Sequence, residues 1–324
     1  MLTPAMSEPA LVTEQLTKFY PTGHIIMGRK PALSELSLHV ERGEVFGYLG
    51  PNGSGKTTTL KLLLGLLRPD GGTARVLGHA LDDPRWKFQA GYLPEQPYFY
   101  DYLTAGEYVE YVGRILGLGR AERRERARAR LEQVGLGRSY DVALRRFSKG
   151  MLQRLGLAQA LVNDPQIVFL DEPMSGLDPL GRRLVRDIIL DLKARGRTVF
   201  FSTHILPDAE ALCDRVAVLR AGRLLKCGRL AEILNLDVSH LEVLASGGDL
   251  DAAPALPEGV RACRALGERF RLEVDEAALV PALQWAQGRG ARVLGVHPVR
   301  QSLEDYFMRE MGVAPAEGAQ WEQA

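Results

Sequence analysis

Short runs of apolar residues alternate with longer amphipathic stretches along residues 11–230 of this chain. The runs 45–49, 167–170 and 198–201 are almost wholly apolar and rich in β-branched or aromatic residues. Such runs are typical of parallel strands that are buried on both faces of a sheet. Parallel strands need helical crossovers, which the amphipathic stretches can supply. The pattern therefore predicts an α/β fold with a largely parallel sheet.

A helical segment interrupts this alternation at about residues 104–165. Thr104 is followed three residues later by Glu107, a capping-box pattern that satisfies free N–H groups at a helix start. The charge run 121–130 has interleaved acidic residues and no aromatic residues, so we expect a solvated helix and no nucleic-acid partner. The segment is predicted to be a helical subdomain inserted into the sheet domain.

A second, smaller domain is expected over residues 231–312. Residues 270–274 alternate like a half-buried strand, and residues 291–296 read as another strand. Between them, Asp275 precedes a helical stretch at 276–287 that it can cap. The sequence predicts a small α+β domain here, without a catalytic constellation.

The two ends of the chain are expected to be flexible at residues 1–10 and 313–324, with a final helix opening at residues 302–307. The N-terminal end lacks a basic region followed by an apolar core, so we expect no signal peptide. No run approaches the roughly 18 apolar residues of a membrane-spanning helix. We therefore expect a chain that does not span a bilayer.

Composition narrows the possible partners and the compartment. The 324 residues include 41 Lys+Arg and 40 Asp+Glu, a formal net charge of +1, which gives no general attraction to nucleic acid or anionic membranes. The cysteines are Cys213, Cys227 and Cys263, and they lack C-x-x-C spacing. Neither a disulfide framework nor a zinc site is predicted, and a reducing cytoplasm fits.

One glycine-rich segment fits the phosphate-binding pattern G-x-x-x-x-G-K-[ST] at every position, between the run 45–49 and a helical stretch at 58–64. Its residues are Gly50, Pro51, Asn52, Gly53, Ser54, Gly55, Lys56 and Thr57, followed by Thr58. Backbone N–H groups can surround phosphate oxygens, while Lys56 can reach the β- and γ-phosphates and Thr57 can ligate Mg²⁺. The alternative is a glycine-rich turn that matches by chance. The segment predicts nucleotide binding but does not identify the nucleotide.

Two acidic residues, Asp171 and Glu172, follow the run 167–170. The carboxyl ends of parallel strands meet at one edge, so we expect both acids beside the phosphate-binding segment and near His204, which follows another apolar run. Asp171 would hold Mg²⁺, and Glu172 would orient or deprotonate the water that attacks the γ-phosphorus. Alternatively, adjacent acids simply solvate a strand end. We expect Lys56, Glu172 and His204 to be the catalytic residues.

The segment 147–154, F-S-K-G-M-L-Q-R, resembles the signature motif of the ATP-binding subunits of ABC transporters. That motif is commonly written L-S-G-G-Q and is followed by Gln-Arg. This copy differs at three of five positions but keeps Ser148 and Gly150. The resemblance covers residues 11–230 and implies a P-loop NTPase fold of the ABC type that hydrolyses ATP with Mg²⁺. It also implies that Ser148 and Gly150 bind the γ-phosphate held by an opposite subunit, expected to be a second copy of this chain.

Other positions match the family in the expected order. Asp178 lies in the loop 175–178, which follows the acidic strand and communicates across the dimer in the family. His204 matches the histidine that contacts the γ-phosphate. Tyr20 matches the aromatic residue that stacks on adenine, with Phe19 as the neighbouring alternative.

The family's glutamine that contacts Mg²⁺ and water falls, counted from Gly91, on Glu95, with Gln96 displaced by one. Either residue can serve. A carboxylate can coordinate Mg²⁺ but cannot donate hydrogen bonds to phosphate or water, so the hydrolysis geometry is expected to differ. The resemblance also makes residues 98–102 candidates for contact with a membrane subunit.

The chain resembles a subgroup of this family that serves exporters of drugs, glycans or lipids, or assists copper-enzyme maturation and gliding motility. Three features carry this resemblance: Glu95, the Ser-Lys-Gly-Met signature and the appended C-terminal domain. The resemblance implies a cytoplasmic ATPase, peripheral at the cytoplasmic face of the cell membrane, that energises a separate transmembrane permease. The transported substrate, its direction, the identity of the second subunit and the role of the C-terminal domain stay open.

Three alternatives compete with this function. A soluble ABC-type ATPase acting on a non-transport partner usually has two cassettes or a long coiled-coil insertion, and this sequence shows neither. A regulatory module without turnover disagrees with the intact Glu172 and His204. A GTPase would carry an Asn-Lys-x-Asp motif, which is absent from the sequence.

Overall fold

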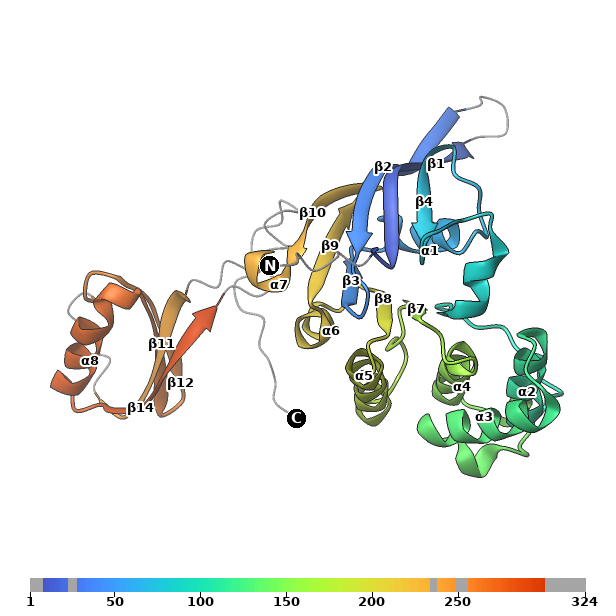
Figure 1. Cartoon of the computed structure of the whole chain (residues 1–324). Coiled ribbons are helices and arrows are strands. Elements are labelled where there is room, and N and C mark those ends of the chain that lie inside the picture. The colour runs from blue at the N-terminus through green and yellow to red at the C-terminus, as the bar shows by residue number, and fades with distance from the viewer. Residues whose placement is uncertain (1–7, 23–27, 234–237, 249–255, 301–324) are drawn as a thin grey trace, which may run out of the picture. The chain divides into compact units, whose positions relative to one another are not determined.

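The computed structural model describes residues 8–22, 28–233, 238–248 and 256–300 of the chain (Figure 1). The chain divides into two compact units, Met1–Leu230 and Ala231–Ala324. Among the described residues, no helix combines the length and the apolar character needed to cross a membrane.

The first unit contains a six-stranded sheet with the order β10-β9-β3-β8-β7-β6. Its strands are β3 (Val45–Leu49), β6 (Ala90–Leu93), β7 (Ile167–Asp171), β8 (Thr198–Thr203), β9 (Arg215–Arg220) and β10 (Arg223–Arg229). All neighbouring pairs are parallel except β9 with β10. Every residue of β3, β7 and β8 is buried, which confirms the strands predicted from the three apolar runs.

Successive residues of the central strands point into two different cores. Val168 and Leu170 of β7 belong to a core shared with the helices on one face of the sheet. Ile167 and Phe169 belong to a second core, shared with α1 (Lys56–Leu63) and an antiparallel sheet on the other face. That sheet has the order β2-β1-β4-β5 and consists of β1 (Leu11–Thr22), β2 (Gly28–Val40), β4 (Gly71–Val76) and β5 (His79–Ala80). The hydrophobic pattern of the sequence did not predict this second sheet.

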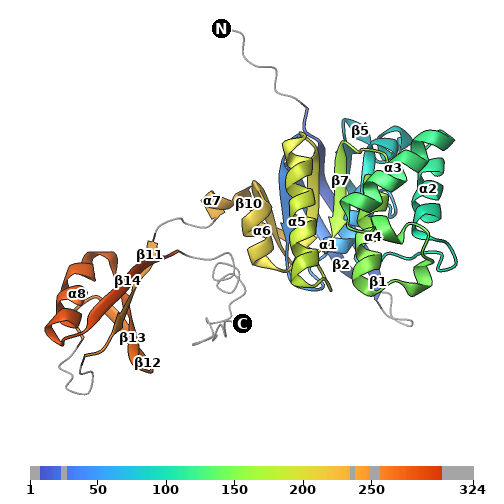
Figure 2. The same cartoon turned by 90° about the horizontal axis from the view of Figure 1, so that it is seen from below.

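The helical subdomain consists of α2 (Ala105–Ile115), α3 (Arg120–Gln133) and α4 (Lys149–Leu161), with short 3₁₀ turns at Gly137–Ser139 and Leu144–Arg146. These helices lie together at one side of the unit (Figures 1 and 2). The predicted capping box is confirmed, because Thr104 Oγ1 accepts from Glu107 N at 3.2 Å and Glu107 Oε2 accepts from Thr104 N at 2.8 Å. The predicted helix over the charge run is confirmed as α3, which buries only Ala127 and Leu131.

The remaining helices of the first unit are η1 (Pro84–Gln89), α5 (Pro179–Ala194) and α6 (Leu206–Leu212), and the short helix α7 (Leu230–Ile233) begins at the last residue of this unit. The second unit has a four-stranded antiparallel sheet with the order β12-β13-β11-β14. It comprises β11 (Val238–Ser246), β12 (Val260–Leu266), β13 (Arg269–Val274) and β14 (Arg292–Arg300), with η4 (Glu276–Ala278) and α8 (Leu279–Gly288).

The second unit confirms the predicted α+β content but corrects one detail. Phe270, Leu272 and Val274 are buried in a core with α8, as the alternation predicted. The predicted cap by Asp275 is wrong, because its side chain makes no capping bond and accepts instead from Arg261 Nε at 2.7 Å. A charged donor competes better for this carboxylate than backbone N–H groups do. The expected final helix at 302–307 and the segments 1–7 and 313–324 lie outside the described residues.

Candidate active site

A cavity of about 580 Å³ opens at the carboxyl ends of β3, β7 and β8. Pockets of this size commonly hold a small organic ligand. The lining residues are Tyr20, Lys30, Pro31, Ala32, Asn52, Gly53, Gly55, Lys56, Thr57, Thr58, Glu95, Glu172, Ser175 and His204. The three predicted segments, the phosphate-binding loop, the acidic strand end and the strand end before His204, therefore meet in one place.

The glycine-rich loop adopts backbone conformations that other residues rarely tolerate. Gly53 and Gly55 have φ angles of 78° and 107°, in the left-handed region. A Cβ on Gly55 would lie 2.4 Å from the carbonyl oxygen of Ala32, and a Cβ on Gly50 would lie 2.4 Å from Ser54 Oγ. The loop thus needs glycine at these points, both for its turns and for its close contacts.

Lys56 is the first residue of α1 and is 6% exposed. Its Nζ donates to Gly50 O at 2.6 Å and lies 3.5 Å from Glu172 Oε1. The ammonium group is therefore held in the curve of the loop, at the helix N-terminus where backbone N–H groups favour anions.

Asp171 ends β7 and is 1% exposed. Its Oδ1 accepts from Ser202 Oγ at 2.5 Å, whereas its buried Oδ2 has no hydrogen-bond partner among the described residues. Burial raises the pKa of Asp171, and the nearby carboxylate of Glu172 adds to the rise. The hydroxyls of Ser202 and Thr57 and the charge of Lys56 oppose it.

The unpaired Asp171 Oδ2 fits a cation. A buried carboxylate oxygen without a donor is costly, and a divalent cation would remove that cost. Among the described residues, no group of three or more His, Cys, Asp or Glu side chains could hold a metal by itself. This composition fits Mg²⁺, which usually takes one or two protein ligands and completes its shell with phosphate oxygens and water.

Glu172 has a left-handed backbone, with a φ of 50°, and is 6% exposed. Its N–H donates to both Ser202 O, at 3.2 Å, and Ser202 Oγ, at 3.1 Å, and these bonds hold the strained residue in place. Its carboxylate lies between two basic groups, Lys56 on Oε1 and His204 Nδ1 on Oε2 at 2.9 Å. The His204 side chain is 47% exposed and borders the open part of the cavity.

The structure distinguishes between the neighbouring candidates left open by the sequence. Tyr20 lines the cavity and is 40% exposed, whereas Phe19 does not line it. Glu95 lines the cavity, and its exposed neighbour Gln96 does not. Tyr20 and Glu95 are thus the members of the two pairs that line the cavity.

Some lining residues were missed by the sequence analysis. Lys30, Pro31 and Ala32 reach the cavity because β2 pairs with β1, with Tyr20 opposite Lys30. Two strand-like stretches separated by a segment that is bounded by Gly23 and Gly28 were the available signal for this hairpin. Ser175 follows the acidic strand and was noted only as part of the loop 175–178.

Ser148, Gly150 and Asp178 do not line the cavity. Ser148 is exposed and caps α4, accepting from Met151 N at 3.3 Å. Asp178 is exposed and caps α5, accepting from Gly181 N at 2.7 Å. Within one chain the signature segment and the phosphate-binding loop therefore do not form a single pocket.

Comparison with known proteins gives consistent matches. Residues 33–175 match the family model described as ABC transporter. The chain is 46% identical over 310 residues to an uncharacterized ABC transporter ATP-binding protein of Synechocystis sp., covering 95% of this chain and 86% of that protein. It is 35% identical over 313 residues to Nod factor export ATP-binding protein I of Ralstonia nicotianae, covering 94% and 95% of the two chains.

Solved structures match the first unit. An ATP-binding subunit of an ABC transporter superposes with a TM-score of 0.62 at 33% identity, covering 69% of this chain and 91% of that one. A dimeric ATP-binding cassette with bound ADP and Pi superposes with a TM-score of 0.63 at 28% identity, covering 68% and 98%. The P-loop fold expected from the sequence is confirmed by these matches.

Proposed function

This chain belongs to the ABC transporter family as an ATP-binding subunit, and from that premise we propose that it hydrolyses Mg-ATP in a dimer and drives export through a separate transmembrane permease. The observation that carries the proposal is the carboxylate of Glu172, held between Lys56 and His204 on the wall of the cavity.

The phosphate-binding loop would hold the triphosphate. Backbone N–H groups of residues 53–58 and the N-terminus of α1 would donate to the phosphate oxygens, and Lys56 would neutralise their charge. Thr57 and the unpaired Oδ2 of Asp171 would hold Mg²⁺. When bound, Mg²⁺ would offset the charge that develops during phosphoryl transfer. Tyr20, at the cavity mouth, would stack on adenine.

Glu172 would position and deprotonate the attacking water. Its carboxylate is an acceptor only, and its strained backbone fixes its direction. His204 would orient this carboxylate through Nδ1 and face the γ-phosphate with the rest of its ring. Glu95, which lines the cavity, would contribute to the metal site as an acceptor that cannot donate to water.

A second copy of the chain would complete the site. The exposed N-terminus of α4, with Ser148 and Gly150, lies outside the cavity of its own chain, which supports a role on a nucleotide bound by the partner. Asp178, which caps α5, would lie in the same interface. ATP bound between two chains would favour the closed dimer, because it would bind the closed dimer more tightly than the open one.

An exposed aromatic surface supports contact with a permease. Tyr98, Tyr102 and Tyr111 are 90%, 68% and 44% exposed, and Tyr100 packs against both Tyr102 and Tyr111. Clustered exposed aromatic side chains are typical of protein–protein contact sites. This surface would place the protein at the cytoplasmic face of the cell membrane. Export is proposed from the printed functions of relatives, which include Nod factor and fluoroquinolone export proteins.

The catalytic assignment is tested by Glu172→Gln. We expect kcat to fall by at least about 100-fold, because an amide is a poor base, while ATP still binds. An ATPase assay with a nucleotide-binding measurement separates the two effects. Unchanged turnover would contradict the proposal.

The shared site is tested by mixing two inactive variants, Ser148→Arg and Lys56→Ala. Random dimers of the mixture contain one intact site in half of the cases, so up to about a quarter of the wild-type rate should return. Activity of Ser148→Arg alone would reject the shared site. The alternative of a soluble ABC-type ATPase predicts that the wild-type protein does not co-purify with membranes.

A further inference from the structure

The buried amide of Gln153 ties α4 to the backbone next to Glu172. Gln153 is 5% exposed, which is rare for glutamine. Its Nε2 donates to the carbonyl of Pro173, the residue directly after Glu172, at 3.4 Å. A buried polar side chain is costly unless it is hydrogen-bonded, so this contact favours one arrangement of helix and carbonyl over others.

The segment that continues from Glu172 also rests on the first turn of α4. A Cβ on Gly176, whose φ is 71°, would lie 3.1 Å from Lys149 Cε. The buried side chain of Leu177 lies 3.5 Å from the position of a Cβ on Gly150. Close packing of this kind transmits displacements, so the segment and the first turn of α4 move together.

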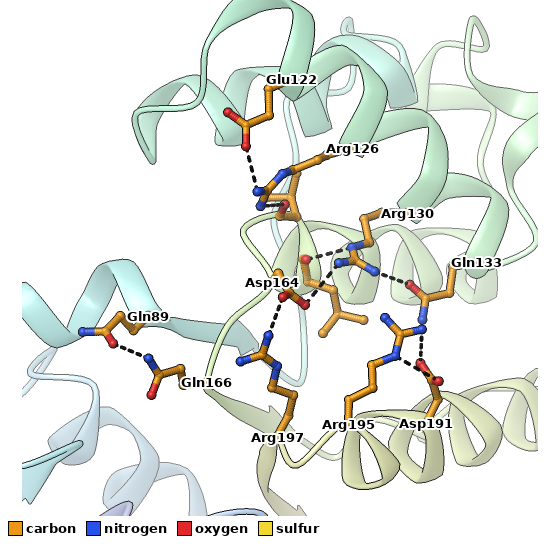
Figure 3. Close-up of polar contacts among 12 residues, drawn as sticks. Gln89, Glu122, Arg126, Arg130, Gln133, Asp164, Gln166, Asp191, Arg195 and Arg197 are labelled. Carbon is orange, nitrogen blue, oxygen red and sulfur yellow. Dashed lines mark hydrogen bonds and ion pairs between the residues drawn. The ribbon is translucent and has the colours of Figure 1, made fainter.

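The other end of α4 is fixed by arginines, as Figure 3 shows. Arg130 of α3 donates from Nε to Leu161 O at 2.9 Å. Asp164, just after α4, pairs with Arg130 at 3.5 Å and with Arg197 at the start of β8. The C-terminal end of α4 is thus anchored to α3 and to the sheet.

We propose that Gln153 is a positioning residue that couples the two active sites of the dimer. The inference rests on the proposed function, in which Glu172 acts on the nucleotide of its own chain and Ser148 on that of the partner. A displacement of Glu172 moves the Pro173 carbonyl, and through Gln153 it moves α4 and Ser148. Closure around one nucleotide therefore favours closure around the other.

The first test compares two glutamines of the same helix. Gln153→Met removes the donor and keeps an unbranched side chain. Gln159→Met is the matched control. The side chain of Gln159 accepts through Oε1 from the hydroxyl of Tyr108 in the helical subdomain, at 2.8 Å, and so bonds a part of the chain far in sequence from Glu172. Full-length variants are compared in melting temperature, ATP affinity, and turnover as a function of ATP concentration.

For Gln153→Met we expect an about tenfold lower kcat, a Hill coefficient near 1 and an ATP affinity within about twofold of wild type. Gln159→Met should keep the turnover and the Hill coefficient even where its melting temperature falls equally. Equal kinetic effects of the two variants, or unchanged kinetics of Gln153→Met, would overturn the coupling.

The second test places Gln153→Met in either member of the Ser148→Arg and Lys56→Ala mixture. The single intact site uses Glu172 of the first chain and Ser148 of the second, so coupling predicts slower hydrolysis for both placements. A loss in only one placement means a purely local role and rejects the inference. An inactive parent mixture rejects the shared site itself, which distinguishes the two failures.

Discussion

Residues at the carboxyl ends of β7 and β8 differ widely in their exposure to water. Asp171 is 1% exposed, whereas the His204 side chain is 47% exposed. Burial raises the pKa of Asp171, so the folded chain holds its proton more tightly than the unfolded chain does. The stability that this group contributes is complete below its ordinary pKa and is lost as the pH rises through the raised value.

The nucleotide-free protein should therefore be stabilised by Asp171→Asn at neutral pH. The amide removes the cost of a buried charge and can still accept from Ser202, and each 1 kcal/mol gained raises the melting temperature by roughly 2–4 °C in a domain of this size. Thermal unfolding in EDTA measures the gain, which should shrink as the pH is lowered. Asp178→Asn, at an exposed cap, is the control without such a gain. ATP hydrolysis should be lost in Asp171→Asn.

The side chain of Glu95 should determine how much Mg²⁺ the reaction needs. Glu95→Gln removes a negative charge from the cavity, so we expect the Mg²⁺ concentration for half-maximal ATPase activity to rise by about three- to tenfold. Gln96→Ala, one residue away and outside the lining, should leave it unchanged. A metal titration of the steady-state rate checks both variants. Equal Mg²⁺ dependence in Glu95→Gln and wild type would remove Glu95 from the proposed metal site.

At the scale of elements, caps determine where several helices begin. Thr104 and Glu107 start α2 by a reciprocal pair of bonds, Ser148 starts α4, and Asp178 starts α5. These caps are local in sequence, because the bonded groups are three residues apart. Their effects on stability should be local as well.

Removing the cap of α2 should destabilise the helical subdomain without touching the nucleotide site. Thr104→Ala should cost about 1 kcal/mol of unfolding free energy, the usual effect of losing an N-cap. Thr104→Ser should restore most of it, because the hydroxyl is kept. Denaturant unfolding with an ATP-binding titration measures both quantities. A loss of ATP affinity would mean that α2 supports the phosphate-binding loop directly.

Elements were predictable where the signal lies within the element itself. The apolar runs gave β3, β7 and β8, and the T-x-x-E pattern gave α2. The antiparallel sheet was missed because many residues of its strands are exposed and because its register depends on the pairing of β1 with β2. Asp275 does not cap the helix because Arg261, on a neighbouring strand, competes with the backbone N–H groups for its carboxylate.

The residues of the phosphate-binding loop and the acidic pair were predictable because the chemistry fixes their spacing, whereas Lys30 enters the cavity only through strand pairing.

At the scale of the molecule, the cavity and the strand ends that carry Glu172 and His204 belong to the first unit. All of its lining residues precede residue 205, and the second unit has its own core of Val243, Phe270, Leu272 and the residues of α8. Each unit thus buries the apolar surface that it needs for folding.

A chain that ends after Ile233 should therefore fold and bind ATP like the full chain. We expect the ATP affinity to stay within about twofold, since units with separate cores fold independently in most cases. Calorimetric titration with ATP measures the affinity. In a thermal unfolding scan, the full chain should show one transition more than the shortened chain. Aggregation of the shortened chain would show that the second unit stabilises the first.

The left-handed backbone of Glu172 has a consequence for the evolution of this protein. Asn and Gly adopt that conformation at lower cost than Glu, so either would relax the strand end and leave the fold intact. Relief of this strain would favour Asn or Gly, whereas selection for turnover and the ion pair of Glu172 with the buried Lys56 would oppose them. At position 172, low backbone strain and ATP hydrolysis therefore require different residues. A descendant that no longer needs to hydrolyse ATP should lose this glutamate early.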